Sequence, residues 1–344
     1  MSPLTTSILI SSLATGAIIT ASSHHWMMAW IGLEINTLAI IPMISKKHHP
    51  RATEAATKYF LTQAMASALI LFSSIMNAQM TGSWNITQIT TTQPTIILSL
   101  ALAMKLGLAP AHFWLPEVLQ GSTMQTALII STWQKLAPIA LLYLTANNMS
   151  ALIILTLGII SALVGGWGGM NQTQTRKIMA YSSIAHLGWI ATISIMLTNI
   201  MLMNLMIYIT MTTTMFSILI LSNSKTIKDT TTLWSTSPSL ILTATLTLLS
   251  MGGLPPMSGF MPKWLILEEL TNQNLTLMAV TLALSALLSL YFYLRLTYTT
   301  TMTLAPNTTT SKHKWRFKTT NKTAMITATA TPSLMLLPIT PLLL

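Results

Sequence analysis

The stretch KLGLAPAHFWLPE at residues 105–117 has a counterpart further along the chain, GGLPPMSGFMPK at residues 252–263. When the two are aligned, their shared residues fall in register: Gly107 on Gly253, Leu108 on Leu254, Pro110 on Pro256 and Pro116 on Pro262. Glu117 then falls on Lys263. Proline inside a helix removes a backbone donor and clashes with the preceding turn, so each stretch predicts a broken helix.

Both stretches lie within long apolar segments. The chain has 344 residues, of which 52% are hydrophobic and 7% charged, and its mean hydropathy of +0.63 excludes an ordinary soluble domain. We therefore predict an all-α polytopic membrane protein with about eleven transmembrane helices of roughly 20 residues each. The predicted spans are 3–21, 26–45, 59–80, 95–119, 124–144, 150–170, 178–196, 199–222, 240–267, 275–299 and 324–344.

The two discontinuous helices are the fourth and the ninth of this series. Because the ninth comes five helices after the fourth, an odd number, they cross the membrane in opposite directions, as in inverted-repeat transporters. We predict one transmembrane domain over residues 1–344, with inverted five-helix repeats at 1–145 and 150–300 and a basic loop and C-terminal helix at 301–344. The alternative is a chance match between two kinked helices.

Positive charges predict the orientation of the chain. If successive loops lie on alternate sides of the membrane, the loop cations all fall on the side of the N-terminus. The loops on the opposite side, around 22–25, 81–94, 146–149 and 198, carry no lysine or arginine. The cations are Lys46, Lys47, Arg51, Lys58, Arg176, Lys177, Lys225, Lys228, Lys312, Lys314, Arg316, Lys318 and Lys322. By the positive-inside rule, the N-terminus faces the cytoplasm or its organellar equivalent and the C-terminus faces the other side. The net charge of +11 is thus spread over membrane loops, which argues against a nucleic-acid partner.

Cysteine is absent from the sequence. Disulfides, iron–sulfur ligation and cysteine-bound zinc are therefore excluded for this chain on its own. The histidines at 24, 25, 48 and 49 have no nearby acids in a metal-type spacing. We expect no cofactor or metal in this chain, so that any redox chemistry takes place elsewhere.

Four ionisable residues, Lys105, Lys135, Lys263 and Glu34, lie deep in the apolar segments. A lysine at the bilayer centre costs roughly 2.5 to 3.5 kcal/mol, so such residues usually serve a pathway for ions or protons. Burial disfavours the charged form of a lysine, and a nearby carboxylate favours it. A buried lysine with a carboxylate nearby can therefore change its protonation state, as a proton carrier requires. We predict that Glu34 is the partner of Lys105, the alternative being a static ion pair that joins two helices.

Lys135 has no obvious acidic partner in the sequence. We predict that it lies in a hydrated cavity, the alternative being a lysine that extends to the membrane surface. Lys263, at the second break, would be the last carrier of the row. His112 and His186 are secondary relay candidates, because a neutral imidazole can bridge water chains near pH 7. A hydrogen-bonded structural role is an equal alternative for each histidine.

Three motifs carry a family resemblance: residues 105–117, YSSIAHLG at 181–188, and GGLPP at 252–256 with the following GF at 259–260 and KW at 263–264. Over essentially its whole length the chain resembles the antiporter-like, proton-translocating membrane subunits of respiratory complex I. The resemblance implies that Glu34, Lys105, Lys135 and Lys263 belong to the hydrophilic axis of that family. It also implies an H⁺-translocating NADH:ubiquinone reductase, in which this chain performs no redox chemistry.

The resemblance further implies a place in the mitochondrial inner membrane, with the N-terminus and basic loops in the matrix and the C-terminus in the intermembrane space. NADH, FMN, iron–sulfur clusters and ubiquinone would be bound by other subunits. Neighbouring antiporter-like and small membrane subunits, together with the lipid bilayer, would be the partners. Two alternatives stay open: a stand-alone cation/proton antiporter, for which the chain has few intramembrane acids, and a structural subunit, which would leave three buried lysines unexplained.

Overall fold

The computed structural model describes residues 2–47, 49–89, 91–303 and 323–340. These residues are almost entirely helical, and their extended contacts are limited to isolated bridges between His25 and Asn85 and between Gln174 and Thr226. The predicted all-α fold class is confirmed. The basic residues predicted at 312–322 lie outside the described residues.

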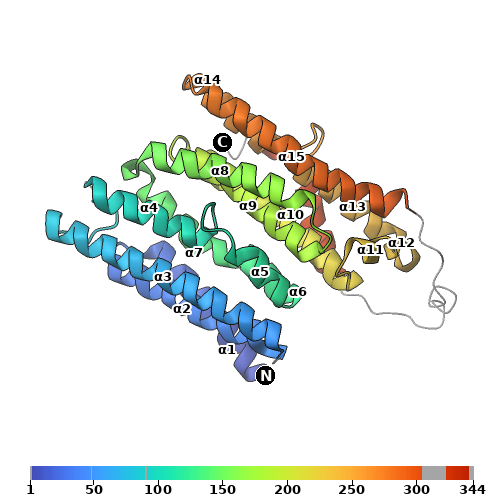
Figure 1. Cartoon of the computed structure of the whole chain (residues 1–344), viewed down its shortest axis with the longest axis horizontal. Helices are drawn as coiled ribbons and strands as arrows, with labels where there is room; N and C mark the ends of the chain where they lie inside the picture. Colours follow the sequence, from blue (N-terminus) through green and yellow to red (C-terminus); the bar gives the residue numbers. More distant parts are fainter. Residues whose placement is uncertain (1, 48, 90, 304–322, 341–344) are drawn as a thin grey trace. The chain divides into compact units, whose positions relative to one another are not determined.

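The chain forms two compact units, and Figure 1 shows their helices coloured along the sequence. The first comprises Met1–Ser161 and Ile190–Thr198, and the second comprises Ala162–Trp189 and Asn199–Leu344.

In the first unit, α1, α2 and α3 pack side by side. Its helices are α1 Pro3–Ser22, α2 Trp26–Ile44, η1 Ser45–Lys47, α3 Pro50–Thr81, α4 Thr92–Leu106, α5 Trp114–Gly121, α6 Met124–Ser131, α7 Trp133–Thr145 and η2 Ala146–Asn148, followed by α8 Ala151–Met170, which continues into the second unit.

In the second unit, α13 packs against α15 and the C-terminal helix. The remaining helices are α9 Thr175–Ile193, which ends in the first unit, α10 Thr198–Ser222, whose first residue belongs to the first unit, α11 Ile227–Thr230, α12 Leu233–Thr236, α13 Pro238–Gly252, α14 Phe260–Asn272, α15 Thr276–Thr301, α17 Ala324–Met335 and η3 Leu337–Ile339.

Seven spans among the described residues are long and apolar enough to cross a membrane. Large apolar side chains on their outer faces are exposed, as expected for helices that meet lipid or other apolar protein surfaces. The shorter apolar helices Thr92–Leu106 and Pro238–Gly252 are the first halves of the two predicted broken helices. The count of eleven helices and the inverted repeat stay predictions.

Both helix breaks occur at the predicted residues. The helix α4 ends at Leu106 and α5 begins at Trp114, while α13 ends at Gly252 and α14 begins at Phe260. A third interruption, which sequence analysis did not predict, separates α6 from α7 at Thr132. At this interruption the hydroxyl and the N–H of Thr132 both donate to the carbonyl oxygen of Leu128, at 2.7 Å and 3.0 Å.

Candidate functional site

The first break begins with a left-handed glycine. Gly107 has φ 79°, and its N–H donates to the carbonyl oxygens of Ala103 and Met104. The N–H of Leu108 also donates to Ala103, at 2.9 Å, so these bonds form a helix cap of the Schellman type. The cap leaves the carbonyl of Leu106 without a partner from the helix ladder. A free carbonyl at this depth needs a donor from elsewhere in the protein or from water.

Lys135 supplies that donor. Its side chain is 1% exposed, and its Nζ donates a hydrogen bond to the carbonyl oxygen of Leu106. The same Nζ lies 5.7 Å from the ring centroid of Trp114, within the range of a cation–π interaction. Lys135 has no obvious acidic partner in the sequence, and in the structure it contacts a backbone carbonyl and an aromatic ring instead. Neither could be paired with Lys135 by sequence alone, because both depend on how α7 meets the break.

Lys105 lies at the end of α4, one residue before that carbonyl. Its side chain is 4% exposed, and its Nζ has no hydrogen-bond partner among the described residues. Glu34 of α2 is near enough to interact with it electrostatically. The two are not within ion-pair distance, and Glu34 instead accepts a hydrogen bond of 3.1 Å from the hydroxyl of Thr37. The structure therefore places the predicted pair in one neighbourhood without a direct contact in the described residues.

His112 lies between α4 and α5, and its side chain is buried. Its Nδ1 is 3.2 Å from the carbonyl oxygen of Pro110, and its ring centroid is 4.2 Å from that of Phe113. These contacts are local to the break. They are contacts that a hydrogen-bonded structural histidine would make, and both the structural role of His112 and its part in a proton relay stay predictions.

The second break repeats the cap of the first. Gly253 also has φ 79°, and its N–H donates to the carbonyl oxygens of Leu249 and Ser250. The carbonyl oxygen of Gly252 accepts a hydrogen bond of 2.9 Å from Nζ of Lys263, which comes from α14. The stem of Lys263 runs along Gly253, where a β-carbon would come within 2.9 Å of Nζ. The absence of a side chain at Gly253 therefore creates the space for this lysine.

A group of buried polar residues adjoins Lys263 in the second unit. His186 of α9 is near enough to interact electrostatically with Lys263, and its Nε2 is 3.3 Å from the hydroxyl of Tyr293 in α15. The His186 ring also lies 5.7 Å from that of Tyr208 in α10. Both tyrosine hydroxyls interact with serines of the 181–188 motif, Ser182 with Tyr293 and Ser183 with Tyr208.

Neither tyrosine was among the residues that the sequence patterns singled out. Tyr208 and Tyr293 are at most 1% exposed, although each carries a hydroxyl that needs a partner. The available signal was a tyrosine in the middle of an apolar helix, together with the serine pair of α9. Among the described residues, no group of three or more His, Cys, Asp or Glu residues could hold a metal ion.

Residues 23–289 match the family model described as NADH:quinone oxidoreductase/Mrp antiporter, TM. Residues 290–344 match the model described as NADH dehydrogenase subunit 2 C-terminus. The chain is 56% identical to NADH-ubiquinone oxidoreductase chain 2 of Varanus timorensis and 54% identical to that of Xenopus laevis, in each case over 344 residues and the full length of both chains.

The structure is similar to a chain in the respiratory complex I of Thermus thermophilus with bound Aureothin. The TM-score is 0.86 and the sequence identity is 26%, and the match covers 99% of this chain and 79% of that chain. The likeness therefore extends over both units, each with its broken helix.

Proposed function

We propose a function from one premise: the chain belongs to the NADH:quinone oxidoreductase/Mrp antiporter family. It is a membrane subunit of respiratory complex I that translocates protons across the mitochondrial inner membrane. Electron transfer from NADH to ubiquinone, which drives this movement, takes place in other subunits. The observation that carries the proposal is that a lysine ammonium binds the free carbonyl at each of two helix breaks, from the buried Lys135 in one and the half-buried Lys263 in the other.

A carbonyl at the end of a helix suits a proton carrier. Helix C-termini bear partial negative charge, so the carbonyls of Leu106 and Gly252 stabilise the ammonium forms of Lys135 and Lys263 without forming a full ion pair. A neutral amine can still occupy the same place, because no buried carboxylate is left without a counter-charge. Each lysine can therefore release its proton at a smaller cost than a lysine that is paired with a fixed acid.

In the first unit, we assign proton uptake to Glu34, Lys105 and Lys135. The Nζ of Lys105 has no hydrogen-bond partner among the described residues, and a buried ammonium of this kind calls for water. The Leu106 carbonyl that binds Lys135 is one residue from Lys105 along the backbone. Water between the two amines would connect them, and Glu34 would stabilise the charge on Lys105 during this transfer.

In the second unit, Lys263 is the final carrier and His186 is a relay next to it. The hydrogen bond between His186 and Tyr293, and the contact of each tyrosine with a serine of α9, add hydroxyl groups that can pass a proton. Phenol and imidazole groups in one hydrogen-bonded cluster support a branch of the pathway at this point.

Membership of this family also supports a membrane location and a set of partners for the chain. The relatives from Varanus timorensis and Xenopus laevis are vertebrate proteins, which supports a multi-pass protein of the mitochondrial inner membrane. The basic loops and the N-terminus then face the matrix and the C-terminus faces the intermembrane space. The chain's partners are neighbouring antiporter-like and small membrane subunits and the lipid bilayer. NADH, FMN, iron–sulfur clusters and ubiquinone are bound by other subunits, consistent with the absence of cysteine here.

Replacement of Lys105 by methionine tests the proposal. Methionine keeps most of the side-chain volume without the charge, so the assembled complex should oxidise NADH while the number of protons pumped per NADH falls strongly. Lys46→Met, at an exposed lysine before α3, is the matched control and should leave the ratio unchanged. The measurement is proton uptake by vesicles that contain the purified complex, with assembly checked on native gels. An unchanged ratio in fully assembled Lys105→Met complex would remove Lys105 from the pathway.

A further inference from the structure

The half-helix α5 (Trp114–Gly121) meets the beginning of α3 (Pro50–Thr81) through three contacts on one face. The α5 residues involved are Trp114, Glu117 and Gly121, three and four positions apart, which places them along one side of a helix. Each contact joins the second half of the broken helix to a neighbour that is itself unbroken. Together they decide where α5 lies relative to the first break.

The outermost contact is a close approach of the two backbones. A β-carbon on Gly121 would come within 2.6 Å of the β-carbon of Ala55 and within 2.7 Å of the carbonyl oxygen of Arg51. Only glycine therefore fits between these helices without a shift of one of them. This approach brings the Glu117 side chain, one turn earlier, within reach of α3.

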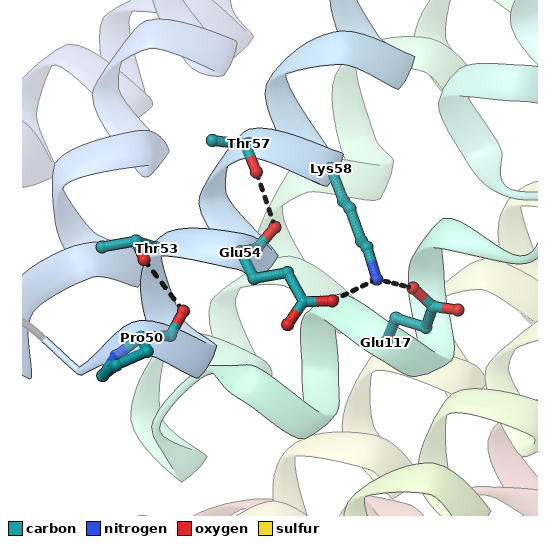
Figure 2. A network of polar contacts seen from close by, with 6 residues as sticks. All are labelled: Pro50, Thr53, Glu54, Thr57, Lys58 and Glu117. Carbon is teal, nitrogen blue, oxygen red and sulfur yellow. Dashed lines mark hydrogen bonds and ion pairs between the residues drawn. The ribbon is translucent and has the colours of Figure 1, made fainter.

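The middle contact is an ion pair. Nζ of Lys58 lies 2.5 Å from Oε2 of Glu117 on α5 and 2.5 Å from Oε1 of Glu54 on its own helix (Figure 2). The pair with Glu54 lies within α3, since the two residues are four apart. Among the ion pairs of the described residues, the bond between Lys58 and Glu117 alone joins two different helices.

The innermost contact reaches the site. Tyr59, the residue after Lys58, packs its ring edge against Trp114 with the centroids 5.8 Å apart. Trp114 donates from Nε1 to the carbonyl oxygen of Met104 at 3.2 Å, and its ring lies 5.7 Å from Nζ of Lys135. One tryptophan therefore connects α5 to the end of α4, to α3 and to the proposed carrier.

We infer that Lys58, Glu117 and Gly121 are positioning residues, which hold α5 against α3 so that Trp114 stays against Lys135 and the carbonyl end of the first break. This inference rests on the proposed function, because it assigns these residues a role through Lys135. None of the three touches the transferred proton. Their loss moves the ring that stabilises the Lys135 ammonium, and thereby changes how readily Lys135 is loaded.

The solvent exposure of the Lys58–Glu117 pair determines how much its loss should change the proton-to-NADH ratio. The Lys58 side chain is 41% exposed and that of Glu117 is 51% exposed, so solvent screens the pair. Exposed pairs of this kind change an equilibrium by about 1.5-fold to fivefold. A complex without the pair should therefore assemble and oxidise NADH, with its proton-to-NADH ratio lowered by a factor in that range.

A charge exchange separates positioning from a general loss of charge. Lys58→Glu places three carboxylates together and should lower the ratio, and Lys58→Met should do so less. The double variant Lys58→Glu with Glu117→Lys again sets one cation between two carboxylates and should restore the ratio. Glu54→Gln is the matched control, because it removes the pair within α3 and keeps the pair between helices, and it should have no effect.

A second series tests whether the effect passes through Trp114. In a Trp114→Leu background, Lys58→Glu should lower the proton-to-NADH ratio no further, since the contact that the pair maintains is already gone. Assembly on native gels and the rate of NADH oxidation are measured for each variant. A wild-type ratio in assembled Lys58→Glu complex, a double variant that fails to restore it, or an undiminished effect in the Trp114→Leu background would each overturn the inference.

Lys135→Met distinguishes this outcome from failure of the proposed function. If Lys135→Met lowers the ratio and Lys58→Glu does not, the positioning role is wrong and the carrier assignment stands. If Lys135→Met itself leaves the ratio unchanged, the carrier assignment fails first, and the positioning of Trp114 loses its purpose.

Discussion

The two helix breaks of this chain share one kind of glycine cap but bind different lysines. In each, a glycine with φ 79° ends the first half-helix, and its N–H bonds to the carbonyls of two residues, Ala103 and Met104 in one break and Leu249 and Ser250 in the other. In each, the carbonyl just before the glycine receives a lysine ammonium. The backbone therefore fixes an acceptor at equivalent positions.

The source of the lysine differs. The first carbonyl is bound by Lys135 from α7, a separate helix, whereas the second is bound by Lys263 from α14, the second half of the same broken helix. The position equivalent to Lys263 in the first break is held by Glu117, which points to Lys58 on α3. The first break also has a second lysine, Lys105, where the other has Met251.

This difference teaches that the acceptor is the shared element and that the donor can come from any helix that packs nearby. With its lysine supplied by α7, the first break leaves position 117 free for an acid that joins α5 to α3. The second break keeps its lysine within one helix and has a single amine. We expect the first to hold protons on two sites, and the second to pass one proton at a time.

The largest expected effect concerns the charge at the first carbonyl. Lys135→Met should nearly abolish the proton pumping that depends on this chain, as should Lys263→Met, because each leaves its carbonyl without a donor and removes a carrier. Lys135→Arg should impair pumping nearly as much as Lys135→Met, since a guanidinium stays protonated at any accessible pH and cannot release its proton. Proton pumping by vesicles, normalised to NADH oxidation, gives the answer.

Full pumping by Lys135→Arg, with no pumping by Lys135→Met, would change the comparison between the two breaks. Lys135 would then be a fixed positive charge that gates the first break, and Lys263 would be the only carrier bound to a break carbonyl. The Lys263→Arg variant, made in parallel, shows whether the two breaks differ in this respect. Assembly on native gels serves as the control for all four variants.

A smaller effect is expected at the two glycines. A β-carbon in the left-handed conformation costs roughly 1 to 2 kcal/mol, so Gly107→Ala and Gly253→Ala should destabilise the complex by similar amounts. The surroundings differ, because the added carbon would lie 2.9 Å from Nζ of Lys263 in the second break but 3.1 Å from a methyl group of Leu115 in the first. Gly253→Ala should therefore reduce pumping more than Gly107→Ala at equal loss of thermal stability. Equal losses of pumping would show that Lys263 needs no defined position.

Much of this arrangement could be predicted from the sequence. The glycines and prolines of residues 105–117 and 252–263 specify the breaks, because their effect on the backbone is local. The lysines stood out because charge is rare in apolar segments. The carbonyl partner of Lys135 could not be predicted, since residues 106 and 135 meet only through the packing of α4 against α7. The same holds for Tyr293, which reaches His186 from 107 positions away.

The predicted pairing of Glu34 with Lys105 shows a further limit. The sequence singles out the only deep acid near the first break, and the structure brings the two charges close enough to interact. The sequence does not reveal that Thr37, one turn along α2, donates a hydrogen bond to the carboxylate of Glu34. Side-chain geometry of this kind depends on rotamers, which sequence patterns do not specify.

The smallest effect on proton pumping is expected where the two breaks differ outside the lysines. His112 and Ser258 occupy equivalent positions, but His112 contacts its own segment at Pro110, whereas the hydroxyl of Ser258 donates to the carbonyl oxygen of Ser333 in α17. Ser333 is fully buried, so Ser258→Ala leaves an acceptor unpaired and should cost about 1 to 3 kcal/mol in the attachment of α17. Ser250→Ala is the matched control, since that buried hydroxyl only donates to Thr247 in its own helix. Hydrogen exchange in residues 324–335 should accelerate in Ser258→Ala and not in Ser250→Ala. If both variants exchange at the wild-type rate, α17 is held by its apolar face alone, and the second break gains nothing from its contact with α17.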